Sequence, residues 1–491
     1  NSTFSTGGFL TLISNAAGTA RVADISNAGT NTGNTINGLV TTERFITAKR
    51  AFRFLTPAVN TPGSIRANWM ENTNNSSASI NNNPVPNYGT HISGSGGNLN
   101  GFDETRTNNP SLYTFNNVTQ AWVPATNTNI QLITGTAYRI MVRGSRSTDL
   151  SNNNATPSLT TLRAAGTLIT GAVLMRKPGG GGSANMPELS AATNGYSFIG
   201  NPYASPVNWT ALEKTDLSST VYIFDPTIAG ANGRGGYVSY NSSTGTSNIS
   251  SQVDNNIQAG QAFFVQTTGP NPSLTFREQY KSGTNKAVFR DPKQKPHLSL
   301  QLLLPGQENT GGSADGLAAY FSNDFDSSIG NEDSYKFTNQ DENIAIVRNG
   351  KTLSIEGRKP VVSKDTLPLK IWQLMQKDYT IRIVLAELHP GLESFLEDSY
   401  LHTSTKLNSN AETFIRFSLT GDSASFAPDR FRVVFQSAVT LPAQLSDIRA
   451  YEKNKGVEVV WSAKSESNLN RYEVEKSKNA QQFELIGTVK A

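Results

Sequence analysis

Short segments in which every second residue is apolar recur along this sequence, and they constrain its fold more than any other feature. In residues 414–419, for example, Ile415, Phe417 and Leu419 fall on one face of an extended chain. Successive side chains of a β-strand point to opposite faces, so this spacing predicts a strand with one buried face. The same alternation occurs in residues 380–385, 431–435 and 457–461. Gly, Asn and Pro turns separate such segments, which predicts an all-β fold of tandem β-sandwich modules of jelly-roll or Ig-like type.

Helical periodicity is nearly absent. Two short stretches, Pro206–Glu213 and Pro390–Asp398, carry the helix-like patterns of the sequence. Asn, Ser, Thr and Gly are abundant, above all in residues 1–155, and their short side chains compete for the backbone hydrogen bonds that a helix needs. We therefore expect few helices, all of them short.

The density of charged residues divides the chain near residue 290. The first 290 residues contain 31 charged side chains, whereas the remaining 201 contain 49. A polar segment at 281–295 precedes the strand-like run HLSLQLLL, and the segment SAVTLPA follows the strand-like run FRVVF. Boundaries at these two places, together with one at residue 40, divide the chain into four parts. The parts are residues 1–40, 41–290, 291–440 and 441–491.

Residues 41–290 contain a weak internal repeat. In each copy an aromatic strand ends in a proline turn, a Trp follows, and a Tyr-x-Phe strand precedes a strand that begins with Gly-x-Ala. The first copy comprises RAFRFLTP (50–57), Trp69, SLYTF (111–115) and ITGTAYRIMV (133–142), and the second comprises NGYSFIGNP (194–202), Trp209, TVYIF (220–224) and IQAGQAFFVQ (257–266). Repeated units usually complete each other's core. We therefore predict one β-module made of two related halves, with Tyr113–Phe115 and Tyr222–Phe224 at equivalent places in its sheets.

Several of these segments resemble a known group of proteins. GYSFIGNPYASPVNW (195–209), TTERFI (41–46), VYIFDP (221–226) and IQAGQAFFV (257–265) are similar to the GNPYP-type β-module of secreted Bacteroidota cell-surface proteins, which are substrates of type IX secretion. Ala204 stands where that group has proline. Residues 332–358 resemble the β-domain that follows this module, and residues 441–489 resemble the fibronectin type III-like module that precedes the sorting domain.

The resemblance implies an extracellular or cell-surface protein that is exported across the outer membrane, with the type IX machinery as a partner during export. A fibronectin type III-like sandwich needs roughly 90–100 residues, so residues 441–491 are expected to be an incomplete module of a longer chain. Residues 1–40 include the apolar run GFLTLIS and are expected to be the end of an upstream β-repeat or β-solenoid.

The motifs of common enzyme classes are missing. Cysteine is absent, which excludes disulfides, thiolate zinc sites and cysteine nucleophiles. The four histidines, at positions 91, 297, 389 and 402, lack metal-ligand spacing, and the sequence has no nucleophile elbow, zinc-protease motif or phosphate loop. We therefore predict that the protein is not an enzyme. Basic runs and apolar runs of membrane-spanning length are also absent, which predicts neither a nucleic-acid partner nor a membrane span.

Acidic side chains crowd the segment 315–333. Calcium prefers six to eight oxygen ligands, which clustered short acids supply. The residues predicted to bind calcium are Asp315, Asp324, Asp326, Glu332 and Asp333. The alternative is a solvated acidic loop, and no other cofactor is expected.

Two further sets of residues are candidates for contact with sugars. Proteins of the resembled group carry O-glycans on Asp-Ser/Thr followed by a small or aliphatic residue, which implies glycosylation at Thr366 and Ser423. Tryptophans either stack sugars or fill sandwich cores. Trp209, Trp372 and Trp461 are predicted to lie in cores, whereas Trp122, beside a turn, is predicted to be more exposed than these three.

Two functions from different classes remain open at this stage. The first is a non-enzymatic structural or adhesive segment of a large secreted cell-surface protein that contacts copies of itself or other surface proteins, as an oligomer or filament. Its basis is the sparse charge of residues 1–290 and the apolar edge at 8–14, since an uncovered edge strand pairs with other chains. The second is an ancillary carbohydrate-binding region of a larger secreted hydrolase, with surface glycans as ligands.

Overall fold

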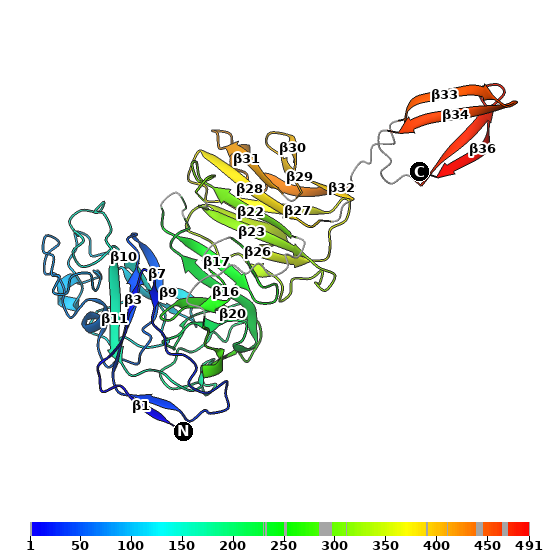
Figure 1. The fold of residues 1–491 in the computed structure, drawn as a ribbon. Coiled ribbons are helices and arrows are strands. Elements are labelled where there is room, and N and C mark those ends of the chain that lie inside the picture. The colour runs from blue at the N-terminus through cyan, green and yellow to red at the C-terminus, as the bar shows by residue number, and fades with distance from the viewer. Residues whose placement is uncertain are drawn as a thin grey trace.

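The computed structural model describes residues 2–228, 230, 233–249, 253–283, 297–310, 312–388, 391–409, 411–437, 445–463 and 470–490. Strands dominate, which confirms the predicted all-β fold (Figure 1). In the described part of the chain the only α-helix is α1 (Ile65–Trp69), and the Ser64 hydroxyl at its start accepts a hydrogen bond from the Ala67 amide. The 3-10 turns are η1 (Gly97–Asn100), η2 (Glu278–Tyr280) and η3 (Ser423–Phe426). Among the described residues no helix is long and apolar enough to span a membrane.

The two helix-like stretches of the sequence are wrong as predictions of helices. The first contains the short strand β14 (Val207–Asn208) and the start of β15 (Glu213–Thr215). In the second, Leu392–Asp398 forms strand β29, while Pro390 lies outside the described residues. Long-range pairing of β29 with β32 (Phe431–Ser437) overrides the weak local preference, because strand formation depends mainly on neighbouring strands.

The N-terminal segment forms one coil that stacks on the chain following it. Strand β1 (Thr3–Ser5) pairs in parallel with β5 (Thr35–Asn37), and β2 (Leu10–Leu12) pairs in parallel with β6 (Val40–Ile46). Strands β1 and β2 therefore stack in parallel on β5 and β6, which is the arrangement of one β-solenoid coil. The hairpin of β3 (Ser14–Asn15) and β4 (Gly18–Thr19) follows β2, which remains the edge strand of its sheet.

The first half of the repeat region, residues 40–166, contains a four-stranded antiparallel sheet in the order β7-β10-β8-β9. Its strands are β7 (Ala51–Leu55), β8 (Leu112–Asn116), β9 (Ala121–Pro124) and β10 (Tyr138–Val142). Strand β11 (Thr160–Gly166) pairs with β6 beside this sheet. Long loops, rich in Asn and Ser, connect α1 to β8 and β10 to β11.

The second half, residues 173–280, repeats this order as β13-β20-β16-β17 and adds β18 at the end. Its strands are β12 (Val173–Arg176), β13 (Tyr196–Gly200), β16 (Leu217–Asp225), β17 (Gly236–Asn241), β18 (Thr246–Ser247), β19 (Asn256–Ile257), β20 (Ala262–Thr267) and β21 (Ser273–Phe276). Strands β12, β21 and β15 form a separate small sheet, and β14 pairs with β19.

The two halves also share their strand register. Arg139 lies between Phe54 and Tyr113 in the first sheet, and Phe264 lies between Phe198 and Tyr222 in the second. Tyr113–Phe115 and Tyr222–Phe224 therefore occupy equivalent places. The tryptophans also correspond, because Trp69 packs edge-to-face on Tyr138 and Trp209 packs edge-to-face on Phe263, the residue equivalent to Tyr138.

The halves meet through reciprocal backbone contacts. The Thr56 amide donates to the Gly260 carbonyl at 3.0 Å, and the Gly200 amide donates to the Gly135 carbonyl at 2.7 Å. Thr56 is equivalent to Gly200, and Gly260 is equivalent to Gly135, so the same bond is made twice across an approximate two-fold axis. Only glycine fits at position 200, because a Cβ there would lie 2.4 Å from the Cβ of Thr56.

The third module, residues 297–437, is one continuous sheet that curls around a single apolar core. The strand order is β30-β29-β32-β27-β25-β26-β23-β22-β28-β31, with β24 beside β26. Its remaining strands are β22 (His297–Leu303), β23 (Asp315–Phe321), β24 (Ser334–Tyr335), β25 (Asn343–Arg348), β26 (Lys351–Arg358), β27 (Thr366–Trp372), β28 (Asp378–Ala386), β30 (Thr403–Lys406) and β31 (Glu412–Ser418). Phe417 of β31 contacts Phe431 of β32 with ring centroids 5.0 Å apart, so β31 at one end of the sheet faces β32 near the other end, as in a sandwich.

Buried polar contacts join the third module to the second half. The Thr220 and Ser334 hydroxyls lie 2.7 Å apart, and the Ser239 and Ser354 hydroxyls lie 2.9 Å apart. Phe337 of the third module extends an aromatic core that both halves share. The other residues of this aromatic core are Phe54, Phe115, Trp122, Ala137, Tyr196, Phe198, Tyr222, Phe224, Tyr237, Ala262 and Phe264. The three parts therefore share one aromatic core and buried polar contacts.

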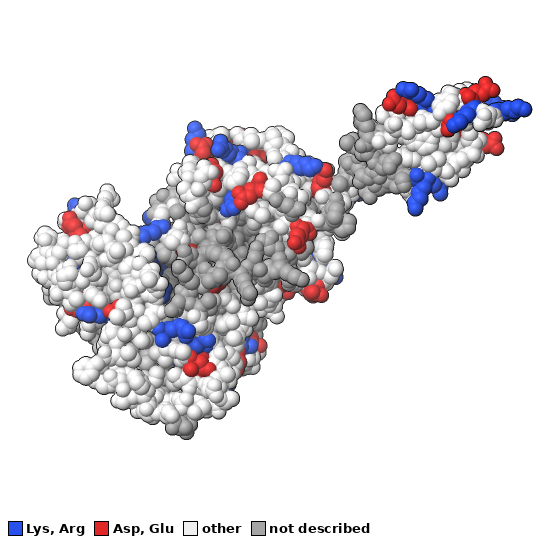
Figure 2. All heavy atoms as spheres, in the orientation of Figure 1, with Lys and Arg blue, Asp and Glu red and all other residues white. Residues whose placement is uncertain are grey.

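Residues 445–463 and 470–490 form two antiparallel hairpins. The first pairs β33 (Leu445–Lys453) with β34 (Gly456–Ala463), and the second pairs β35 (Arg471–Ser477) with β36 (Phe483–Lys490). The predicted boundary at 437–443 coincides with the end of β32 and residues outside the described part, and the boundary near 290 also lies outside it. Figure 2 shows sparse charge over the N-terminal part of the visible face and denser charge on the third module and the hairpins.

Candidate functional site

A polar pocket of about 350 Å³ opens in the third module, at the point where β27 changes partners. Residues 369–372 of this strand pair with β25, whereas residues 366–368 pair with β32. Because the two partner strands diverge there, a gap forms between the β25–β26 hairpin and the start of β27. This pocket is called the β27 pocket below. It is lined by Ser327, Ile346, Val347, Arg348, Asn349, Glu356, Arg358, Lys359, Pro360, Asp365, Thr366, Leu367 and Pro368.

Glu356 contributes a buried carboxylate to the wall of the β27 pocket. Its residue surface is only 1% exposed, and its Oε1 lies 3.4 Å from Arg348 Nη1 and 3.8 Å from Arg358 Nη1. Its Oε2 is buried and makes no hydrogen bond within the described residues. Burial raises the pKa of Glu356 above its ordinary value, although the two guanidinium groups oppose this.

Arg358 is the loosely held cation of the pocket. Its guanidinium lies 3.8 Å from Glu356 and 3.9 Å from Asp365 Oδ2, beyond hydrogen-bond distance in both cases. Lys359 is exposed, and Thr366 presents an exposed hydroxyl. Within the described part of the chain neither side chain has an ion pair or hydrogen bond, whereas Asp365 already accepts from the Val362 amide at 2.8 Å. The uncommitted groups at the mouth are therefore mainly hydrogen-bond donors.

Arg348, in contrast, is fixed in place. It donates to the carbonyls of Ser327, Ser328 and Gly357 and lies 3.3 Å from Asp333 Oδ1. Asp333 also accepts from the amides of Gly330 and Gly357, and burial raises its pKa to about 6 despite these bonds and Arg348. This network holds the loop beside the pocket against β26.

The five residues predicted to bind calcium do not form one ligand set. Asp315 lies in β23, is 1% exposed, and pairs with Lys336 Nζ at 2.5 Å. Asp333 faces Arg348, and Asp326 accepts from the amides of Ser327 and Ser328. The last two are Asp324, whose Oδ2 lies 3.2 Å from the Ser322 hydroxyl, and Glu332, which accepts from the Asp326 amide. In the ranges that the structure describes, no three His, Asp or Glu side chains gather as a metal site. The sequence shows these acidic residues, but it does not show the hydrogen-bond and ion-pair partners that they have in the fold.

Both predicted glycosylation sites are exposed. Thr366 is the first residue of β27 rather than a turn residue, and it lies at the β27 pocket. Ser423 opens η3, where the side chain of Asp422 accepts from the Ala424 amide. A sugar on Thr366 would occupy the mouth of the pocket.

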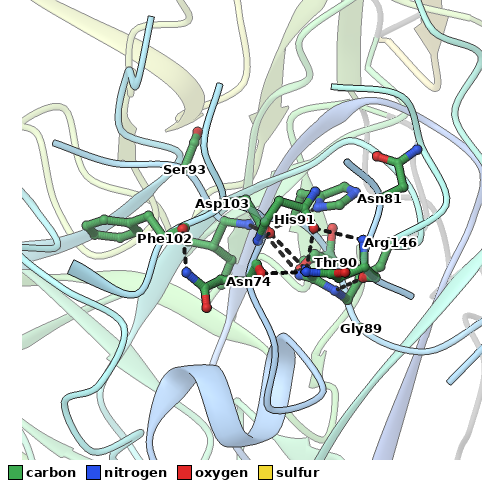
Figure 3. A network of polar contacts seen from close by, with 12 residues as sticks. Asn74, Asn81, Gly89, Thr90, His91, Ser93, Phe102, Asp103 and Arg146 are labelled. Carbon is green, nitrogen blue, oxygen red and sulfur yellow. Dashed lines mark hydrogen bonds and ion pairs between the residues drawn. The ribbon is translucent and has the colours of Figure 1, made fainter. Parts of the chain in front are cut away.

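The histidines do not come together. His91 is fully buried, and its Nδ1 lies 3.2 Å from Asp103 Oδ2. Figure 3 shows this pair inside the loops of the first half, with Arg146 bound to the same carboxylate at 2.8 Å. Burial opposes the charge of Asp103, but the adjacent His91 and the hydrogen bonds from Arg146 lower its pKa below the ordinary value. Arg146 also donates to the carbonyls of Asn82 and Thr90, and Asp103 accepts from the Asn75 amide, so this buried network holds the Asn-rich loops together.

The remaining histidines are separate from this network. His297 stacks on Tyr320 with ring centroids 5.5 Å apart, and His402 is exposed. His389 lies outside the described residues.

The tryptophans differ in part from their predicted places. Trp209 is fully buried, as expected. Trp372 is half-buried and faces Lys370, whose Nζ lies 5.3 Å from the ring centroid, and Trp461 is half-buried in the C-terminal hairpins. Trp122 is half-buried like Trp372 and Trp461, because it packs into the aromatic core that the two halves share.

The comparison with known families covers most of this architecture. Residues 10–435 match the family model described as a domain of unknown function, DUF8693. The chain belongs to the DUF8693 family. The matched region runs from β2 to β32, so the family unit includes the coil except β1, both halves, the third module and the β27 pocket, but not the C-terminal hairpins. No curated protein and no solved structure gives a significant match to the chain.

Proposed function

We propose that this chain is a non-enzymatic structural or adhesive segment of a large secreted cell-surface protein, one that contacts copies of itself or other surface proteins. The observation that carries the proposal is the buried joint between the two halves and the third module. Each part contributes aromatic side chains to the same core, and two buried hydroxyl pairs join the second half to the third module. Parts joined in this way transmit force and hold a fixed spacing, as a surface spacer must.

The N-terminal coil supports the self-contact. Its β2 strand is the edge of a sheet, and residues 1–20 contain no charged residue and no proline. Charge and proline are the usual protection of an edge strand against pairing with another chain. Phe9 is 93% exposed, and Phe4 and Ile13 are also exposed. An uncharged edge favours contact with an identical edge, because no like charges oppose each other.

Sedimentation velocity of the native full-length protein tests this proposal. We expect oligomers at micromolar concentration, and we expect Phe9→Asp to shift the protein toward monomer, since it places a charge on the edge. Val118→Asp, in the exposed turn between β8 and β9, is the matched control and should leave the distribution unchanged. A strictly monomeric wild-type protein, with Phe9 buried by its own chain, contradicts the proposal.

The second candidate function is an ancillary carbohydrate-binding region of a larger secreted hydrolase. The observation that favours it is the β27 pocket, whose volume is in the range of small-ligand sites. A protein that serves as a spacer can also bind a sugar in this pocket. Sedimentation tests self-association, whereas a ligand-binding measurement tests the pocket.

A further inference from the structure

We propose that the β27 pocket binds an acidic sugar, with the carboxylate of the sugar on Arg358 and Lys359 and its hydroxyls toward Asp365 and Thr366. The inference does not depend on self-association through the N-terminal coil. It concerns a ligand site in the third module, which is separate from that coil.

The first argument comes from the hydrogen-bonding groups that lack partners. Arg358 has no side-chain hydrogen bond to a described residue, and Lys359 and Thr366 have none either. A guanidinium offers up to five N–H donors and an ammonium three, whereas an ionised carboxylate only accepts. A carboxylate is therefore the ligand group that satisfies this mouth best, and arginine binds it with two parallel bonds.

The second argument comes from the spacing of Arg358. Its guanidinium lies 3.8 Å and 3.9 Å from its two carboxylate neighbours, Glu356 and Asp365. Neither carboxylate is within hydrogen-bond distance of Arg358, so the guanidinium can turn toward a ligand without breaking a hydrogen bond. Arg348 on the inner side is occupied by backbone carbonyls, which leaves Arg358 and Lys359 as the cations available to a ligand.

The third argument concerns the body of the ligand. The pocket holds about 350 Å³, far more than a carboxylate group needs. Its lining includes the half-buried Val347 and the exposed Pro368, which are apolar, and Asp365 stands at the mouth as an acceptor. A sugar acid presents C–H faces to such walls and hydroxyl donors to such a carboxylate. A purely apolar acid would leave Asp365 facing a non-polar surface, at a cost in desolvation.

Glu356 shapes the floor of the site. Its buried Oε2 has no partner in the described residues, and the burial of this group disfavours its charge. Glu356 pairs with Ala319 of β23, and this pairing fixes its place before a ligand arrives.

Titration calorimetry on the whole 491-residue chain, made in a host that does not glycosylate Thr366, tests the inference with sodium glucuronate as the probe. We expect binding at least about tenfold tighter than that of glucose or acetate, because only glucuronate supplies both the carboxylate and the hydroxyls. Arg358→Met should weaken glucuronate binding at least about tenfold, the loss expected for one charge-assisted pair. Arg432→Met, an exposed arginine of β32 outside the pocket, should leave it unchanged.

Each other result overturns the inference. Glucuronate that binds no better than glucose removes the role of the carboxylate, and acetate that binds as well as glucuronate shows an adventitious anion contact only. If Arg358→Met lowers the melting temperature, Thr366→Val and Lys359→Met replace it, and both should weaken binding several-fold in a folded chain. Unchanged affinity in all three variants places any glucuronate elsewhere on the molecule. None of these outcomes bears on the sedimentation of the protein.

Discussion

Phe54 packs edge-to-face against Phe198, its own counterpart in the second half, with ring centroids 4.6 Å apart. Phe198 also contacts Trp122 of the first half, and Phe54 contacts Tyr237 of the second. Trp122 and Tyr237 are equivalent by register, so the contacts are exchanged across the approximate two-fold axis. Neither half closes this core without the other.

Phe198→Ala should therefore destabilise the whole body rather than one half. We expect a loss of about 3–5 kcal/mol in the free energy of unfolding, which is typical of a buried Phe truncated to Ala. The double variant Phe54→Ala/Phe198→Ala should lose less than the sum, because the two rings share a contact. Urea denaturation measures both, with the exposed Phe9→Ala as the control, expected within about 0.5 kcal/mol of wild type. Strict additivity would mean that the two rings are not coupled.

The Asn201 side chain explains the GNP motif of the sequence. Its Nδ2 donates to the carbonyls of Ser205, Ile257 and Gln258, and its Oδ1 accepts from the Tyr203 amide. Asn201→Asp keeps the size but removes every donor, which leaves three buried carbonyls facing a carboxylate. We expect a loss of at least about 2–3 kcal/mol in urea denaturation at pH 7.

The matched control for this substitution is Asn154→Asp, at an exposed residue whose side chain makes no hydrogen bond to the described residues. It should change stability by less than about 0.5 kcal/mol. Equal effects at the two positions would show that the carbonyls around Asn201 are satisfied in another way.

Local patterns sufficed for the strands and for the repeat. The alternation at Ile415 and Phe417 predicted β31, and the two Tyr-x-Phe segments led to β8 and β16. These patterns lie within a few residues, so they can be seen without knowledge of the partners. The helix-like stretch before Asp398 failed for the opposite reason, since its structure depends on β32, more than thirty residues away.

Local sequence patterns do not predict the candidate site. Arg358 and Asp365 lie at the two ends of the short connection from β26 to β27, but the sequence does not show that the end of β25 lies beside them in the pocket. Asp315 was assigned to a calcium loop because nothing near it reveals the buried ion pair with Lys336. One signal was present in KTLSIEGR, where Glu356 stands among apolar and small residues of a strand with both faces covered. A charged residue in such a run indicates a buried polar contact.

The buried pair of Asp103 and Arg146 should be more important for stability than the exposed pairs. Asp103→Ala leaves the Arg146 guanidinium buried without its carboxylate, and we expect a loss of about 3–5 kcal/mol in urea denaturation. Glu397→Ala, which breaks the exposed pair with Arg432, should cost less than about 1 kcal/mol. Similar losses for the two variants would indicate that solvent reaches the loops drawn in Figure 3.

Asp333 should make the stability of the protein depend on pH in an unusual direction. Burial raises its pKa in the folded chain to about 6 from the ordinary value of 3.8, although the Gly330 amide and Arg348 oppose this. Between these two values the folded state binds more protons at this residue than the unfolded state. Its contribution to stability therefore increases as the pH falls from 7 toward 4, by an amount on the order of 1–3 kcal/mol.

The measurement is urea denaturation of wild type and Asp333→Asn from pH 4.5 to 7.5. The asparagine variant is expected to be less stable throughout, because its amide cannot accept from both Gly330 and Gly357. The informative quantity is the difference between the two proteins, which should grow as the pH falls, since other buried acids titrate in both. Asp326→Asn is the control of opposite sign, because hydrogen bonds from Ser328 and Ser327 lower the pKa of that exposed carboxylate. A wild-type-minus-Asp333→Asn difference that stays constant or shrinks toward low pH would show that Asp333 remains ionised beside Arg348.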